Sequence, residues 1–136
     1  MSFRIVNPER LGEPKGWSNG LLAPPGGRLL FVAGQTARDP DGVVRTEGFV
    51  AQFEKTLTYA LEVVREAGGE PRDIGRMTVF VTDLDAYMAS RRELGEAFRR
   101  HMGSHYPAMS LVEVSRLVDS GALVEIETTA VIATAD

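Results

Sequence analysis

Cysteine is absent from this chain of 136 residues, which excludes disulfide bonds, thiolate zinc sites and cysteine nucleophiles. No apolar run approaches the roughly 18 residues of a membrane-spanning helix, and the start, Met1-Ser2-Phe3-Arg4, lacks the apolar core of a signal peptide. The net charge of −4 disfavours nucleic acid as the main partner, because phosphate binding draws most of its affinity from Lys and Arg. These absences predict a cytoplasmic protein with no membrane partner.

The residues that are present are typical of one folded domain. Hydrophobic residues make up 43% of the chain and charged residues 25%, which argues against disorder. No low-complexity linker or shift in composition divides the sequence, so residues 1–136 are predicted to form a single domain.

Turn-forming residues crowd the first third of the chain. The strongest turn signal is Pro24-Pro25-Gly26-Gly27, in which Pro25 presets φ and Gly26 can take the positive φ of a type II turn. Apolar runs lie on both sides, at residues 21–23 and 29–33. The pattern predicts a β-hairpin whose second strand ends at Gly34-Gln35.

Two segments carry the three- and four-residue apolar spacing of a helix with one buried face. The first covers residues 46–67, with Thr46 as a candidate N-cap. The second runs from a cap at Asp83 or Asp85 to about residue 101, where Gly103 ends it.

Three more segments are predicted strands, at residues 76–82, 109–117 and 122–133. The first is apolar on both faces and is therefore expected to be central. The other two alternate, and Asp119-Ser120-Gly121 supplies the turn that would pair them. The resulting order, β-β-α-β-α-β-β, predicts an α+β sheet with both helices on one face.

Helices on one face leave the other face of this sheet uncovered, although its strands carry apolar residues on both faces. An exposed apolar face of this size needs a partner, and another copy of the chain is the simplest candidate. The sequence therefore predicts a homo-oligomer.

Several stretches, in order and with matching spacings, carry a family pattern. Ala33-Gly34-Gln35 is similar to a Ser-Gly-Gln motif at a strand end, and Tyr106-Pro107-Ala108-Met109-Ser110 to a Pro-Ala-Arg strand opening. Residues 78–84, 112–117 and 124–127 match the strand before the second helix and the paired C-terminal strands. Together these motifs resemble the RidA/YjgF family over nearly the whole chain.

This resemblance implies a chorismate-mutase-like fold assembled as a homotrimer, with small-molecule clefts between neighbouring subunits. It also implies a chemistry, the hydrolysis of reactive enamines and imines such as 2-aminoacrylate to keto acids and ammonia. In the family an arginine holds the substrate carboxylate, a glycine amide orients it, a glutamate positions water, and an aromatic residue from the N-terminal segment covers the cleft. No cofactor is implied.

Carried over by position, Gly34 matches the glycine and Glu125 the glutamate, while Trp17 stands where the family usually has tyrosine. Leu111 replaces a small or thiol residue. Met109 stands where the arginine should be. By the same resemblance Gln35 and Arg91 are placed as ligand-binding residues of the cleft.

Met109 is the informative departure, because a thioether cannot form the charged, bidentate hydrogen bonds that arginine makes with a carboxylate. One interpretation is that Met109 only fills interface space. The other is a cleft retuned for a neutral, apolar or cationic ligand. Both predict weak or absent turnover of 2-aminoacrylate.

The other candidates also keep a structural alternative. Glu125 and Glu127 lie about 7 Å apart on one strand face, where Glu125 is either a general base on water or part of a solvated edge, and Glu127 is interpreted as structural. Trp17 either stacks on a ligand or packs at a subunit boundary. Arg91 either restores the missing positive charge or is solvated.

The remaining charged clusters predict no further site. The arginines on the second helix alternate with Glu93 and Glu96, as in a salt-bridged outer face, so nucleic acid is not expected to bind them. His101 and His105 have no third metal ligand at a suitable spacing, so no metal site is predicted.

Two functions follow as hypotheses, with a third that is weaker. The first is a Rid-type hydrolase or deaminase with an altered substrate range, using Glu125 to hold water. The second is a non-catalytic trimeric protein that binds or senses a small ligand. The third is RNA cleavage, since some relatives carry an endoribonuclease L-PSP label.

Overall fold

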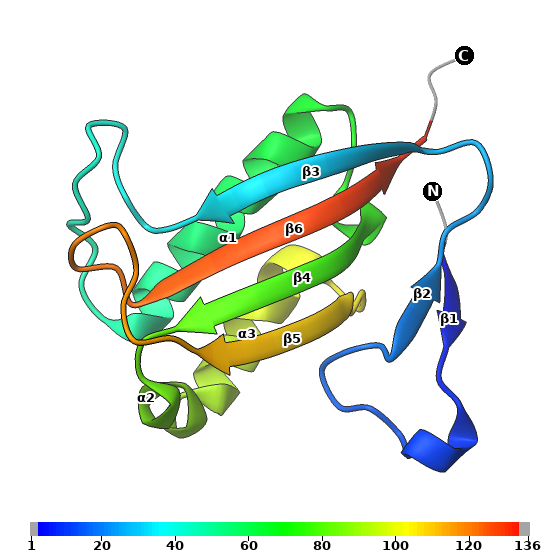
Figure 1. Ribbon diagram of the computed structural model, residues 1–136, viewed down its shortest axis with the longest axis horizontal. Helices are drawn as coiled ribbons and strands as arrows, with labels where there is room; N and C mark the ends of the chain where they lie inside the picture. Colours follow the sequence, from blue (N-terminus) through cyan, green and yellow to red (C-terminus); the bar gives the residue numbers. More distant parts are fainter. Residues whose placement is uncertain (1–2, 134–136) are drawn as a thin grey trace.

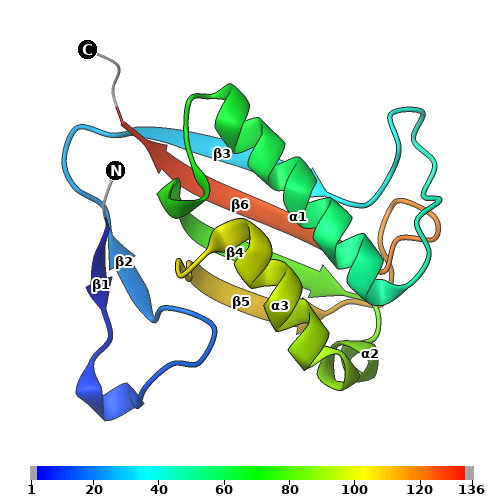
Figure 2. The same cartoon turned by 180° about the vertical axis from the view of Figure 1, so that it is seen from behind.

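A four-stranded sheet with helices on one face forms the body of the molecule in the computed structural model, which describes residues 3–133 (Figures 1 and 2). The strand order is β3-β6-β4-β5; β4 and β5 run parallel, and the other neighbouring pairs are antiparallel. The α+β class and the interior position of β4 are confirmed. The strands are β3 (Arg28–Gln35), β4 (Ile74–Val81), β5 (Ala108–Glu113) and β6 (Val124–Ile132).

The predicted N-terminal hairpin is wrong. Strand β2 (Gly20–Leu22) pairs instead with β1 (Arg4–Val6) in a small separate sheet, and β3 pairs with β6. The turn itself forms, with Gly26 at φ 87°, but it connects strands of two different sheets rather than two strands that pair with each other. A turn motif specifies that the chain reverses, whereas the partner of a strand depends on distant segments.

The last two strands are also not neighbours. β6 lies between β3 and β4, and β5 takes the edge beside β4 (Figure 1). β5 ends at Glu113, before the predicted residue 117, and the amide of Val114 still donates to Val81 O at 2.8 Å. The chain then crosses to the far side of β4 through a loop that contains the expected turn, closed by Ala122 N and Asp119 O at 3.1 Å.

Helix α1 (Phe49–Glu66) covers the sheet as predicted, although it begins three residues later than Thr46. Gly48, at φ 90°, is its N-cap, and Thr46 O instead accepts a hydrogen bond from Gln52 Nε2 at 3.0 Å. Its predicted apolar stripe is largely buried in the core, at Phe53, Leu57, Ala60, Leu61 and Val64.

The second predicted helix is two helices, α2 (Leu84–Ala89) and α3 (Arg91–Met102). Asp83 caps α2 by accepting a hydrogen bond from Ala86 N at 3.1 Å. Ser90 separates the helices because its amide closes the last turn of α2 on Tyr87 O while its carbonyl accepts from Leu94 N. Helix α3 lies beside α1 on the same sheet face (Figure 2). Within residues 3–133 no helix is long and apolar enough to span a bilayer.

The opposite face of the sheet, here called the open face, has no helix over it among the residues that the structure describes (Figure 1). It carries the side chains that alternate with the buried ones, among them Phe31, Phe80, Val112 and Glu125. Leu29 is 63% exposed and Phe31 76% exposed. Such large apolar side chains on one face are typical of a surface that meets another protein chain.

Substitution of Thr56 by Val is expected to raise the free energy of unfolding by about 1 kcal/mol, because Thr56 Oγ1 is fully buried and has no hydrogen-bond partner in residues 3–133. The melting temperature should rise by about 3 °C. Thr58→Val is the matched control on the same helix, since Thr58 Oγ1 donates to Lys55 O at 2.6 Å and should gain nothing. A less stable Thr56→Val protein would contradict the expectation.

Candidate functional site

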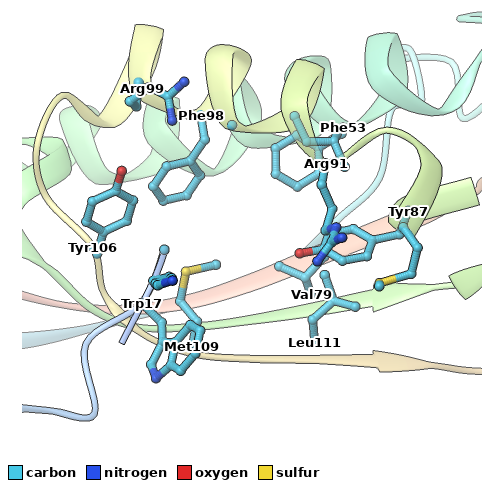
Figure 3. A pocket seen from close by; sticks show the side chains of 15 residues that line it. Trp17, Phe53, Val79, Tyr87, Arg91, Phe98, Arg99, Tyr106, Met109 and Leu111 are labelled. Atoms are coloured by element: carbon cyan, nitrogen blue, oxygen red, sulfur yellow. The ribbon is translucent and has the colours of Figure 1, made fainter. Parts of the chain in front are cut away.

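A cavity of about 500 Å³ opens between helix α3 and the edge strand β5 (Figure 3). Met109 and Leu111 face it from β5, because these two residues alternate with the side chains of the open face and point towards the helices. Phe53 and Phe98 close the helix side, and Trp17 flanks Met109 from the N-terminal segment. The cavity has the size of ordinary small-molecule sites.

Trp17 is held at this place by the residue that follows it. The Ser18 amide donates to Pro107 O at 3.0 Å, and its hydroxyl donates to Tyr106 O at 2.7 Å. The indole Nε1 of Trp17 donates to Asn19 Oδ1 at 3.1 Å. The N-terminal segment is therefore attached to the chain directly before β5, which brings Trp17 next to Met109 although 92 positions separate them in the sequence.

Positive charge predominates in the lining of this cavity. Lys15, Arg91 and Arg99 contribute to it, whereas no Asp or Glu of the described part of the chain does so. Arg91 extends from the start of α3 towards the sheet (Figure 3). A lining with three cations, no carboxylate and an apolar floor is complementary to a ligand that combines negative charge with apolar surface, and it disfavours a cationic ligand.

The remaining candidates lie at the other edge of the sheet. Ala33 and Gly34 form an irregularity in β3, where the register with β6 shifts between Val32 and Gln35. A Cβ on Gly34 would overlap Oε2 of Glu125 and lie 2.8 Å from its Cδ, so glycine is what allows this carboxylate to lie against the backbone of β3. Bulges of this kind commonly adjust side chains beside functional sites.

The pKa of Glu125 is raised above its usual value of 4.5, first by burial and then by the negative charges of Asp119 and Glu127. Asp119 was predicted only as a turn residue. In the structure its carboxylate accepts a hydrogen bond from Thr36 Oγ1 at 2.6 Å and pairs with Arg38 at 3.5 Å. A half-buried carboxylate with a raised pKa is a better proton acceptor than an ordinary surface glutamate.

The candidate residues thus fall into two groups within one chain. Trp17, Arg91, Met109 and Leu111 share the cavity on the helix-covered face at the β5 edge. Gly34 and Glu125 lie together on the open face near the β3 edge. Gln35 borders a separate hollow of about 260 Å³, and its side chain donates to Ala33 O at 3.0 Å.

Several lining residues were not identified from the sequence. Tyr106 stacks on Phe98 with ring centroids 5.7 Å apart, and together they form an aromatic wall of the cavity. Arg99 was predicted to belong to a salt-bridged outer face of the second helix, and no role was predicted for Lys15. Of these residues only Tyr106 could have been identified from the sequence, because it lies three positions before Met109. Among residues 3–133, no three His, Asp or Glu side chains are grouped as metal ligands.

Comparison with known proteins identifies the family. The protein family described as Endoribonuclease L-PSP matches residues 13–132 of the sequence. The chain belongs to this family. It is the RidA/YjgF group that the motifs resembled, and the predicted membership is confirmed.

Two relatives in this family are similar over most of their length. The RutC family protein slr0709 of Synechocystis is 35% identical over 98% of this chain and 100% of its own. The 2-iminobutanoate/2-iminopropanoate deaminase of Salmonella typhimurium is 35% identical over 77% of this chain and 80% of its own.

A solved structure of the family has the same fold. YyfB of Yersinia pestis, a protein of unknown function of the conserved Rid protein family, superimposes with a TM-score of 0.83. It is 29% identical, and the match covers 97% of this chain and 100% of that one.

Replacing Glu125 by Gln is expected to stabilise the protein at neutral pH, because the charged form of Glu125 is disfavoured by burial and by two nearby carboxylates. A carboxyl group whose pKa is higher in the folded protein than in the unfolded chain lowers the free energy of unfolding as pH rises through the folded pKa. Well below the unfolded pKa it is protonated in both states and has no such effect. The melting temperature of Glu125→Gln should therefore exceed that of the wild type by roughly 2 °C at neutral pH. The difference should vanish below pH 4.5.

Glu47→Gln is the control, since it removes one charge from an exposed position outside the sheet. A lower melting temperature of Glu125→Gln at neutral pH would show that Glu125 makes favourable contacts as an anion, and would refute the argument from burial.

Proposed function

We propose that this chain is a Rid-type hydrolase that deaminates enamines or imines, with a substrate range altered by Met109. The observation that carries the proposal is the Glu125 carboxylate lying against Gly34, with a raised pKa, in a chain of this family. The 2-iminobutanoate/2-iminopropanoate deaminase of Salmonella typhimurium, 35% identical, supports the same reaction class.

The proposed active unit is a homotrimer. In one chain the Glu125 group and the Met109 group lie on opposite faces and towards opposite edges of the sheet, so neither edge alone holds a complete site. A neighbouring copy that brings its β3 edge to this β5 edge would join them in one cleft. The exposed Leu29 and Phe31 of the open face support such an interface.

In the proposed reaction Glu125 accepts a proton from water as the water oxygen bonds to the carbon of a C=N group. Glu125 returns this proton to the nitrogen to give a tetrahedral amino alcohol. The hydroxyl proton of the amino alcohol then passes through Glu125 to the same nitrogen as the C–N bond breaks, ammonia leaves and a C=O bond forms. The balance needs only the imine and one water. No redox or metal step is required by this stoichiometry.

Met109 sets the substrate range in this proposal. Small 2-imino acids carry a carboxylate beside the reacting carbon, and a thioether offers this group no charged hydrogen bond. We therefore expect weak turnover of 2-aminoacrylate.

Met109 also favours the alternative function, a trimer that binds a small ligand without catalysis. An assay of ammonia release from enamines and imines generated in situ distinguishes the two functions. Hydrolysis that disappears in Glu125→Gln supports the enzyme, and no release from any compound at high protein concentration refutes it.

Met109→Arg is expected to raise kcat/KM for 2-iminobutanoate by roughly thirtyfold or more, because a buried charged pair is worth about 2 kcal/mol or more. Met88→Arg, which adds the same side chain at the exposed α2 rim of the cavity, should give no comparable gain. No gain in Met109→Arg with an intact oligomer would mean that the cavity has diverged at more than one residue.

The assembly is tested separately by Phe31→Asp, which places a charge on the open face at the β3 edge. Light scattering should give three times the chain mass of 14.8 kDa for the wild type and a smaller species for the variant. Val63→Glu changes an exposed apolar residue on the outer side of α1 and should remain trimeric. A monomeric wild type would contradict the proposed assembly.

A further inference from the structure

Helix α3 presents an unusual series of residues to the cavity. Arg91, Gly95 and Arg99 are four positions apart, so they lie on one helix face, and all three line the cavity. Leu94 and Phe98 on the adjacent face are buried and anchor the helix to the core. The helix therefore holds two cations along the cavity with a residue that lacks a side chain between them.

Gly95 makes room for one of these cations. A Cβ at this position would lie 3.1 Å from Nη1 of Arg99 and 3.8 Å from its Cζ, so the guanidinium group folds back over the glycine. Long helical side chains lean towards the N-terminus of their helix, and for Arg99 this is the direction of Arg91. Glycine is otherwise the least favourable residue except proline in a helix interior, so its place here is explained by this packing.

Neither cation is neutralised within the described part of the chain. Arg92 and Arg100 on the same helix pair with carboxylates, at 3.7 Å from Glu96 and 3.0 Å from Glu54. In residues 3–133 Arg91 and Arg99 have no ion pair or hydrogen bond of this kind, and the cavity between them has no acidic residue. The two arginines that face the cavity are thus the two that keep their donors available.

An apolar and aromatic surface lies beneath this pair. Trp17 and Met109 form it on the sheet side of the cavity, below Phe98 (Figure 3), and the Phe98–Tyr106 stack adds an aromatic wall. An apolar floor beneath two guanidinium groups is complementary to both parts of an amphipathic anion. Burial of the apolar part supplies affinity, and charged hydrogen bonds fix its orientation.

We infer that this cavity binds an organic acid with an apolar or aromatic body, whose carboxylate is held by Arg91 and Arg99 on α3 while the body packs on Trp17 and Met109. The anion is then held at α3 and not on β5, where Met109 leaves only apolar surface. This inference deepens the proposed function by naming the ligand class of the same cleft, and it depends on that function only for the step in which the ligand reacts.

The test uses 3-phenylpropionate and its uncharged amide as probes of equal size. Trp17 is the single tryptophan of the chain and lines the cavity, so its fluorescence reports binding without any catalytic step. We expect the acid to bind roughly tenfold or more tightly than the amide in low salt, and Arg91→Gln or Arg99→Gln to abolish this preference. Arg92→Gln is the control on the same helix, since the Arg92 side chain is 94% exposed and does not line the cavity.

A second variant separates binding from stability. Gly95→Ala should raise the melting temperature, because alanine favours a helix interior, yet weaken acid binding severalfold by displacing the Arg99 guanidinium. Amide binding should be unchanged. Gly95 is a positioning residue in this account, and a loss of acid and amide binding together would point to general damage and contradict it.

Equal affinities for acid and amide, no binding of either, or acid binding unaffected by Arg91→Gln and Arg99→Gln would each overturn the inference. These outcomes are independent of hydrolysis. Charge-dependent binding without ammonia release supports the anion site and refutes only the enzyme, whereas ammonia release without charge-dependent binding does the reverse.

Discussion

Strand β6 lies between β3 and β4, and most of the arrangement depends on that placement. Its buried side chains, Val124, Ile126 and Ala130, meet helix α1, while Glu125 and Glu127 alternate to the open face. Because β6 occupies the middle, β3 and β5 become the two edges of the sheet. The carboxylate candidate and the Met109 cavity are thereby separated within one chain, and in the proposed function two edges from neighbouring copies meet to complete the site.

Local structure was largely predictable, whereas strand pairing was not. The spacing of Phe53, Leu57 and Leu61 specifies a helix, and Gly26 and Gly103 specify positions where the chain turns or a helix ends, because these signals act over a few residues. The partners of β2 and β5 depend on segments far along the chain. A turn motif beside an apolar run carries no information about them, so both predicted hairpins were wrong.

The candidate site was predictable residue by residue but not as an arrangement. Resemblance to the family selected Gly34, Trp17 and Met109 by position, yet nothing in the sequence indicated that Met109 and Glu125 face opposite sides of the sheet. Arg99 was missed for a physical reason. A helix face that alternates arginine with glutamate predicts ion pairs. Only the folded structure distinguishes an arginine that pairs with a carboxylate from one that folds over a glycine towards a cavity.

Trp17 reaches the cavity on a segment that belongs to neither the main sheet nor its helices. Residues 7–19 connect β1 to β2. The short helix Glu9–Leu11 in this segment has no buried residue. Ser18, near the end of the segment, attaches it to the chain directly before β5 by a hydrogen bond to Tyr106 O. Substitutions along this segment can change one wall of the cavity while the core contacts of the domain stay as they are. In evolutionary terms, ligand preference can diverge here faster than the fold, by drift in a segment of which only Ser18 is buried.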